Sequence, residues 1–399
     1  MPEGHFHWHS TSRAFAGDHE VALLPTDAPP AIPCDIVSDA LQMLYSAIAG
    51  SGVFCVSSRA LPELAQLTAG QFATLTGGTS GAPKVIVRTH ASWIKSFEAN
   101  AAMFSYVTSD SIAVLGSLSH SLALYGVLEA AHHGLDMHAL SPLKPSRQAA
   151  RLQEHGCTIL YATPTQLRLL PKSTQLPDVR LILCGGGALS DDTRRHIIAL
   201  CPDAKLHVFY GAAETSFITL GGPDTPTGSV GRPYPDVELA VRGPDTNGTG
   251  EIWVRSPYLF DRYLDGDSQH TQRDGDWLTV GEYGYLDEEG HVFLRGRAGR
   301  IVNISDQTVF PEELEAHFNA LDGINHCAVL ARHDTLRGHH LIAVLEGADD
   351  AKLAQNIRDY CAANALVTPR DVLFLDPFPL LASGKPDLQR IAHLTEGTQ

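Results

Sequence analysis

Short apolar runs alternate with stretches of helical periodicity between residues 72 and 296. Two stretches, 145–156 and 190–200, place apolar residues three or four positions apart, and Ser190 stands where a helix N-cap belongs. The apolar runs, which we expect to form strands, are residues 111–119, 157–164, 179–187 and 205–211. A strand followed by a helix, repeated along the chain, predicts β-α-β units around a largely parallel sheet. The residues before about position 70 are only weakly patterned.

The pattern then changes. Residues 248–260 and 284–302 are typical of antiparallel hairpin strands joined by Gly and Asp-Glu-Glu-Gly turns. Further on, a helix beginning at Pro311 is followed by two strands, a second helix and a last strand. Such a unit of roughly 100 residues has the size of a small independent domain.

The expected fold class is therefore α/β, with two domains. Residues 1–297 would form a large N-terminal domain of mixed, mainly parallel sheets and helices with a small β-barrel-like part. Residues 298–399 would form a small α+β domain, with the boundary near Arg297–Arg300.

Composition narrows the class of protein. The chain of 399 residues is 44% hydrophobic and 19% charged and has no run of eighteen apolar residues, so no membrane span is expected. The net charge of −16 argues against nonspecific nucleic-acid binding and makes any phosphate site local. The N-terminus lacks the basic and apolar segments of a secretory signal. The seven scattered cysteines form no CxxC pair, which favours a reducing cytoplasm.

The segment LTGGTSGAPKV, residues 75–85, is rich in groups that bind anions. Its glycines can present backbone N–H groups, its hydroxyl residues add donors, and Lys84 adds a charge. It is not a Walker A loop, because Ala82-Pro83 precedes the lysine and no GK[ST] is present. Taken alone, the segment fits a phosphate loop and a plain flexible loop about equally well.

Five later motifs follow this loop in order: GGG (185–187), YGAAE (210–214), VGEYG (280–284), GRAGR (296–300) and SGK (383–385). With them the chain resembles the adenylate-forming superfamily of acyl-CoA and aryl-CoA synthetases, peptide-synthetase adenylation domains and luciferases. The resemblance runs from about residue 70 to the C-terminus. It implies a large N-terminal domain, a small mobile C-terminal domain, and activation of a carboxylic acid with ATP and Mg²⁺.

The resemblance also implies roles for residues of each motif. The β- and γ-phosphates of ATP would be held by Thr76, Gly77, Gly78, Thr79, Ser80, Gly81 and Lys84. The adenine and the substrate carboxylate would be flanked by Gly185, Gly186, Gly187, Tyr210, Gly211, Ala212 and Ala213. The ribose would be held by Glu282 and Arg297.

Three further residues would serve the chemistry. Glu214 matches the family's Mg²⁺-binding carboxylate, and Lys385 matches the lysine that reaches the forming acyl-adenylate. His120, in GSLSHSLALYG, resembles a histidine that lines the acyl pocket; the alternative is a buried structural histidine. Because no Asp lies near it to receive an amino group, an amino-acid substrate is disfavoured.

The chain departs from the family pattern at several positions. The phosphate loop comes early, which implies an abbreviated N-terminal part. Ala213 replaces a Thr, and Glu282 replaces an Asp. Asn303 replaces a Lys, and Asp306 places a negative charge where relatives have Gly along the pantetheine path. This charge would disfavour free CoA, which carries phosphates of its own, and a carrier-protein phosphopantetheine thiol is the alternative acceptor.

Other candidates carry less weight. The alternating His5, His7 and His9 could bind a metal, but a mobile terminal tail is the expected interpretation. The pairs His132-His133 and His339-His340 have no partners at metal-ligand spacing in the sequence. Two tyrosines, Tyr125 and Tyr161, could stack on an aryl acid or belong to the core.

The expected function is a cytoplasmic acid–thiol ligase that forms an acyl-adenylate from an aryl or acyl acid and releases pyrophosphate. Transfer to a phosphopantetheine thiol, of CoA or of an acyl carrier protein, would follow in a biosynthetic pathway. Two alternatives remain open: an adenylating enzyme that uses another acceptor, and a non-catalytic binding relative.

Overall fold

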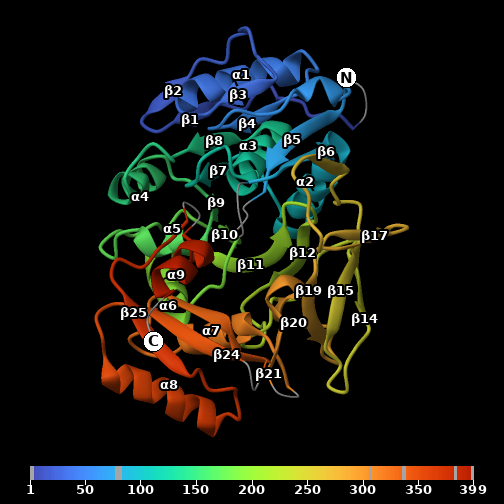
Figure 1. Ribbon diagram of the computed structural model, residues 1–399. Helices are drawn as coiled ribbons and strands as arrows, with labels where there is room; N and C mark the ends of the chain where they lie inside the picture. Colours follow the sequence, from blue (N-terminus) through green and yellow to red (C-terminus); the bar gives the residue numbers. More distant parts are fainter. Residues whose placement is uncertain (1–3, 77–82, 305–306, 335–337, 382–383, 397–399) are drawn as a thin grey trace.

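The computed structural model describes residues 4–76, 83–304, 307–334, 338–381 and 384–396 (Figure 1). The largest sheet has nine strands, which in spatial order are β13 (Arg232–Pro233), β12 (Ser216–Gly221), β11 (Lys205–Ala212), β10 (Leu181–Cys184), β9 (Ile159–Ala162), β7 (Ser111–Val114), β8 (Asp136–Ala139), β1 (Ala14–Ala16) and β2 (His19–Val21). The strands from β1 to β11 in this order run parallel, and the outer pairs are antiparallel.

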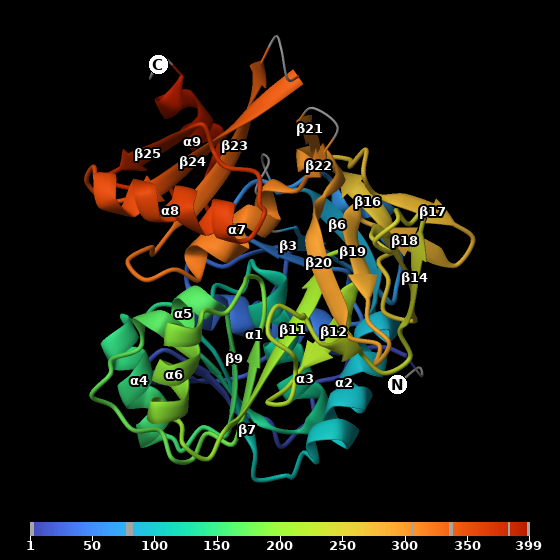
Figure 2. The same ribbon diagram turned by 90° about the horizontal axis from the view of Figure 1, so that it is seen from below.

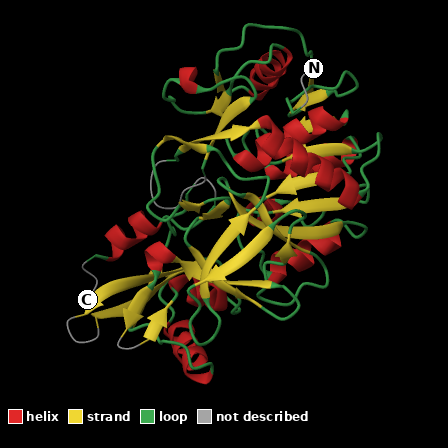
Figure 3. Cartoon of the chain, turned by 90° about the vertical axis from the view of Figure 1, so that its right-hand side faces the viewer, coloured by secondary structure: helices red, strands yellow, loops and turns green. Residues whose placement is uncertain are grey.

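Helices cover both faces of this sheet (Figure 3). Neighbouring residues of one strand belong to different cores: Ile112 and Val114 pack with one set of helices, and Ala113 packs with another. The helices on the first face are α1 (Val37–Ala49), α2 (His90–Phe104) and α3 (Ser121–His133). Those on the second face are α4 (Pro145–Glu154), α5 (Pro164–Leu169) and α6 (Asp191–Leu200). A parallel sheet buried on both faces explains why its strands appear in the sequence as continuous apolar runs.

Two further sheets complete the N-terminal part. A mixed sheet contains β16 (Arg262–Asp265), β6 (Val85–Thr89), β5 (Gln71–Leu75), β4 (Cys55–Ser57) and β3 (Ala31–Pro33), with the short helix η1 (Leu64–Gln66) between β4 and β5. An antiparallel sheet contains β17 (Gln272–Asp274), β18 (Trp277–Thr279), β15 (Gly250–Arg255), β14 (Glu238–Arg242), β19 (Glu282–Leu286) and β20 (Val292–Arg297). The latter is the hairpin region that the sequence predicts.

The C-terminal elements, orange to red in Figure 2, pack to one side of these sheets. They follow η2 (Ala298–Arg300) and comprise β21 (Val302–Ile304), β22 (Gln307–Val309), α7 (Pro311–Asn319), β23 (Cys327–Asp334), β24 (Gly338–Glu346), α8 (Ala351–Ala363), β25 (Asp371–Leu375) and α9 (Leu388–Thr395). The α/β fold class with a small α+β part is confirmed. The domain limits 1–297 and 298–399 stay a prediction.

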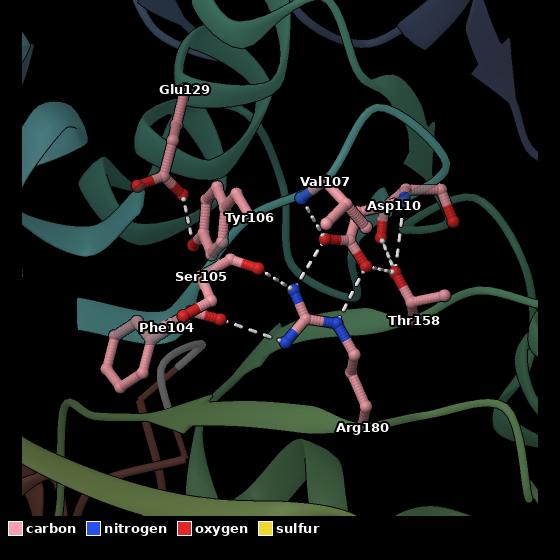
Figure 4. A network of polar contacts seen from close by, with 9 residues as sticks. Phe104, Ser105, Tyr106, Val107, Asp110, Glu129, Thr158 and Arg180 are labelled. Atoms are coloured by element: carbon pink, nitrogen blue, oxygen red, sulfur yellow. Dashed lines mark hydrogen bonds and ion pairs between the residues drawn. The ribbon is translucent and has the colours of Figure 1, made fainter. Parts of the chain in front are cut away.

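A polar network ties together the amino-terminal ends of the central strands (Figure 4). Asp110 precedes β7, Thr158 precedes β9 and Arg180 precedes β10. Arg180 Nε donates to Asp110 Oδ1 at 2.7 Å, and Thr158 Oγ1 donates to the same oxygen at 2.8 Å. Because ligands of such sheets bind beyond the carboxyl ends of the strands, this network is structural and lies at the opposite edge from the expected site.

The weakly patterned start of the chain is more ordered than its sequence indicates. Phe6 is 3% exposed and packs among aromatic rings that include Phe72 and Phe97. Its backbone N–H donates to His90 Nδ1 at 3.1 Å. The expectation of a mobile tail at His5–His9 is therefore wrong, because Phe6 anchors this arm in the core.

No helix in the described part of the chain is long and apolar enough to cross a bilayer.

Candidate active site

The expected phosphate loop connects two antiparallel strands. β5 ends at Leu75 and β6 begins at Val85, and the two strands pair antiparallel, so the loop joins a hairpin. At its base, the N–H of Thr76 donates to the carbonyl of Lys84 at 2.9 Å, and the N–H of Lys84 donates to Thr76 Oγ1 at 3.0 Å. The predicted phosphate ligands Gly77, Gly78, Thr79, Ser80 and Gly81 lie outside the described residues.

A sharp turn between β11 and β12 carries Glu214. Gly211 must be glycine, because a Cβ there would lie 1.9 Å from the carbonyl oxygen of Ser216. The hydroxyl of Thr215 accepts from the N–H of Ala212 at 3.0 Å and closes the turn. Ala212 thus ends β11, Ala213 lies in the turn, and the half-buried Glu214 projects from it.

A fully buried arginine on β6 forms hydrogen bonds to this turn. Arg88 on β6 donates to the carbonyls of Ala213 and Tyr258 and, at 2.6 Å, to Ser216 Oγ. Burial lowers the pKa of the Arg88 guanidinium to about 9, and the nearby Glu214 opposes this shift. Arg88 therefore ties the backbone just before Glu214 to the Ser216 side chain and to the segment that carries Tyr258.

Tyr263 connects the Glu214 turn to the phosphate hairpin. Its hydroxyl donates to Glu214 Oε1 at 2.9 Å and forms a second hydrogen bond, also 2.9 Å, with Thr271 Oγ1. The Nζ atom of Lys84 lies 5.3 Å from the centre of the Tyr263 ring. The Mg²⁺-binding carboxylate and the phosphate-binding lysine implied by the resemblance are therefore brought together around one tyrosine.

A second group of charged residues forms where β19 and β20 pair. Glu282 stands opposite Arg297, and Arg297 Nε lies 2.8 Å from Glu282 Oε1. Burial raises the pKa of the Glu282 carboxyl, and Arg297 and Lys385 oppose that shift. The hydroxyl oxygen of Tyr210 is buried beside the same pair and has no hydrogen-bond partner among the described residues. An unpaired buried hydroxyl is a polar group that a ligand could satisfy.

Lys385 reaches this group from the C-terminal part of the chain. Burial and the neighbouring Arg297 lower the pKa of the Lys385 ammonium, and Glu282 partly offsets this. The preceding Gly384 has φ +81° and packs so closely on α5 that a Cβ would lie 2.6 Å from Thr165 Oγ1. Gly384 thus fixes the backbone before Lys385 against α5, and the charge of Lys385 interacts with those of Glu282 and Arg297.

The glycines after β10 lie against the neighbouring strand and helix. A Cβ on Gly185 would fall 2.1 Å from an atom of the Phe209 ring, so this ring covers the glycine. Gly186 adopts φ +87°, which favours glycine, and Gly187 packs near Pro164. The role of the three glycines beside adenine stays a prediction; at Gly185 the Phe209 ring occupies the space that a side chain would take.

His120 occupies the N-cap position of α3 and is exposed. It pairs through its backbone with Leu75, directly before the phosphate loop. Burial by the surrounding protein nevertheless lowers the pKa of its imidazole, so the choice between an acyl-pocket residue and a structural histidine stays a prediction. Tyr125 and Tyr161, in contrast, are core residues: they are 4% and 1% exposed, and their hydroxyls donate to Ser96 and Glu129.

Sequence reasoning missed Arg88, Phe209 and Tyr263. A charged residue inside the apolar run VIVRT was a visible signal for Arg88. Tyr263 lies in no motif, and its role depends on a contact with a residue 49 positions away.

The chain is similar to known families and proteins. The AMP-binding enzyme family matches residues 26–264, and the AMP-binding enzyme C-terminal domain matches residues 313–385. An uncharacterized acyl-CoA ligase, YhfT, of Bacillus subtilis is 28% identical over 79% of this chain and 67% of its own length. A putative long chain fatty acid-CoA ligase, VraA, of Staphylococcus epidermidis is 30% identical over 64% of this chain. That match spans 56% of VraA, less than two thirds of its length.

Solved structures share the fold. The o-succinylbenzoate CoA synthetase MenE of Bacillus subtilis, in complex with its acyl-adenylate intermediate, superposes with a TM-score of 0.78 at 19% identity. The match covers 95% of this chain and 94% of MenE. Because the AMP-binding family matches more than half of the sequence, and its C-terminal domain matches the part that carries Lys385, the chain belongs to the AMP-binding enzyme family.

Proposed function

We propose that this protein uses ATP to activate a carboxylic acid as an acyl-adenylate and then transfers the acyl group to a thiol. The observation that carries the proposal is the position of Lys385 beside the Glu282–Arg297 pair. The residues implied in phosphate and metal binding, Lys84 and Glu214, form a second cluster around Tyr263.

In the first step, a carboxylate oxygen of the acid attacks the α-phosphorus of ATP. The bond from that phosphorus to the bridging oxygen breaks, and pyrophosphate leaves with the electron pair. Negative charge gathers on the α-phosphate oxygens, where the ammonium of Lys385 would stabilise it. The Glu282–Arg297 pair would hold the ribose, with Glu282 accepting from its hydroxyls.

The half-buried carboxylate of Glu214 suits a hard cation. A Mg²⁺ ion bound there would supply positive charge to the phosphates of ATP. Tyr263 would orient the carboxylate through Oε1, while Arg88 holds the turn that carries it.

In the second step, a thiolate would attack the acyl carbon, and AMP would leave. CoA is the proposed acceptor, because similar proteins such as YhfT and a 2-succinylbenzoate–CoA ligase are named CoA ligases; the phosphopantetheine of an acyl carrier protein is the alternative. Asn303, which stands for the family's lysine, is exposed and its Oδ1 accepts from Thr308 at 3.2 Å. Asp306, the other departure in this region, lies outside the described residues.

We propose an aryl or acyl acid as the substrate, in a cytoplasmic biosynthetic pathway. One similar protein is named for an aryl acid: a 2-succinylbenzoate–CoA ligase of Lactococcus lactis is 26% identical over 78% of this chain. All seven cysteines are free and buried, which supports a reducing compartment. We further propose 1–297 and 298–399 as the two domains, with η2 as the hinge.

Exchange of labelled pyrophosphate into ATP, across a panel of aryl and aliphatic acids, tests the first step. At least one acid should support exchange. If folded protein supports none, the non-catalytic alternative is favoured. Adding CoA or carrier protein to the accepted acid then identifies the acceptor by its thioester product.

A further inference from the structure

The N-terminal arm lies across the end of helix α3, away from every residue that the proposed reaction uses. The N–H of His9 donates to the carbonyl of Ala131 at 2.8 Å, and Thr11 Oγ1 donates to the carbonyl of Gly134 at 2.9 Å. These bonds fix the arm where α3 ends. The arm brings its histidines to the two histidines that close this helix.

Four side chains with metal-binding atoms meet at this point. The rings of His7 and His132 lie 4.4 Å apart between centroids. His132 Nε2 lies 3.0 Å from Glu98 Oε1 on α2. One ligand atom each from Glu98, His132 and His133 can be chosen so that all lie within 4.8 Å of one another. A tetrahedral zinc ion with bonds of about 2.0–2.2 Å needs ligand atoms roughly 3.3–3.6 Å apart, so small rotations of these three side chains would suffice. His7 lies outside this group of three, and its ring contact with His132 places it near enough to turn toward the ion as a fourth ligand.

The surroundings of these histidines suit metal binding. His133 Nε2 is 3.1 Å from the carbonyl of Phe97 and, as a donor, leaves Nδ1 with a free lone pair. A ligating histidine commonly donates its other N–H to a carbonyl in this way. His132 Nδ1 is buried without a hydrogen-bond partner among the described residues. Together with Nδ1 of His133, it is therefore a second nitrogen that no hydrogen bond from the described part of the chain occupies.

We propose that His7, Glu98, His132 and His133 form a binding site for a divalent transition-metal ion, with zinc as the best-suited ion. Three imidazoles and one carboxylate match the ligands that zinc takes, whereas Mg²⁺ and Ca²⁺ prefer sites made of oxygen atoms. The ion would link the N-terminal arm to α2 and α3. The site is separate from the Mg²⁺ expected at Glu214 and does not depend on the proposed adenylation.

The ligands come from three separate segments of the sequence, which is why spacing alone gave no metal site. His7 and His132 are 125 positions apart, and Glu98 comes from a different helix. The expectation that His132-His133 lack partners for a metal is therefore corrected by the fold.

Zinc titration of the tag-free protein by calorimetry tests the proposal. The protein is first treated with a chelator, and excess Mg²⁺ is kept present to fill oxygen-rich sites. We expect one zinc ion per chain. Glu98→Gln removes the anionic ligand but keeps a hydrogen-bonding group, and its side chain is 63% exposed, so the fold should survive. His7→Asn removes an imidazole from the arm.

Each variant should weaken zinc binding by at least the roughly 10- to 100-fold that loss of an outer-shell partner costs. His19→Asn, an exposed histidine on β2, is the matched control and should bind like the wild type. Zinc should also raise the melting temperature of the wild type and of His19→Asn, but not that of the two ligand variants. Absence of stoichiometric binding to the wild type, or unchanged binding in both ligand variants, would overturn the proposal.

Discussion

Replacing Tyr263 with phenylalanine removes one hydroxyl group from the candidate active site and leaves the aromatic ring in place. The ring keeps its position beside Lys84, whose Nζ lies 5.3 Å from the ring centre. What is lost is the 2.9 Å hydrogen bond to Glu214 Oε1 and the bond to Thr271. Burial raises the pKa of Tyr263, so its hydroxyl stays protonated and donates throughout the usual assay range.

The magnitude follows from that bond. A hydrogen bond to a charged group contributes about 1.5–3 kcal/mol, equivalent to roughly 10- to 100-fold. Because the hydroxyl orients a proposed metal ligand, we expect the Mg²⁺ concentration for half-maximal pyrophosphate exchange to rise by about that factor at fixed ATP. Tyr285→Phe is the matched control, since Tyr285 stacks on Phe293 elsewhere on β19 and β20. An unchanged Mg²⁺ dependence in folded Tyr263→Phe would refute the assignment of Glu214.

Three further changes probe the site and the core. Gly211→Ala should destabilise the fold by about 1–3 kcal/mol or more, because its Cβ would meet the Ser216 carbonyl; an unaltered urea midpoint would contradict this. Burial lowers the pKa of Lys385, so the rate of pyrophosphate exchange should already fall at a pH below the usual lysine pKa of about 10.4. Lys385→Arg should remove this alkaline fall, because arginine stays charged; a fall that persists in the variant would exclude Lys385 as its source. Burial raises the pKa of Glu129 to about 8, so the folded state holds a proton that the unfolded state releases near pH 4.3. Stability should therefore fall by up to about 1.4 kcal/mol per pH unit between those values, and Glu129→Gln should flatten the slope in urea unfolding from pH 5 to 8; an equal slope in both proteins would assign the effect to other groups.

The central sheet could be predicted because its strands are buried on both faces. Burial on both sides leaves no polar alternation, so β7, β9 and β10 stand out as apolar runs between helical segments. The strands β1 to β4 were missed for a physical reason. Each has only three residues, and its pairing partners include distant segments, as in the parallel pairing of β1 with β8. Three residues are too few for a periodic signal.

The candidate site shows the same division. The motifs predicted that Lys385, Glu282 and Arg297 serve the same active site, and the fold brings these three residues together. Their chemical roles stay predictions. What no motif contains is the supporting layer: Tyr263 and Arg88 act through contacts that exist only in the folded chain.

Adenylate formation by Lys385→Ala tests the central claim most directly. The substituted side chain lies on a C-terminal loop, so the fold should remain and can be checked by its unfolding transition. Loss of one preorganised donor costs about 2.7–4 kcal/mol, or roughly 10²–10³ in rate. With an acid that the wild type accepts, we predict that pyrophosphate exchange falls by at least that factor. Exchange near the wild-type rate in folded Lys385→Ala would contradict the account.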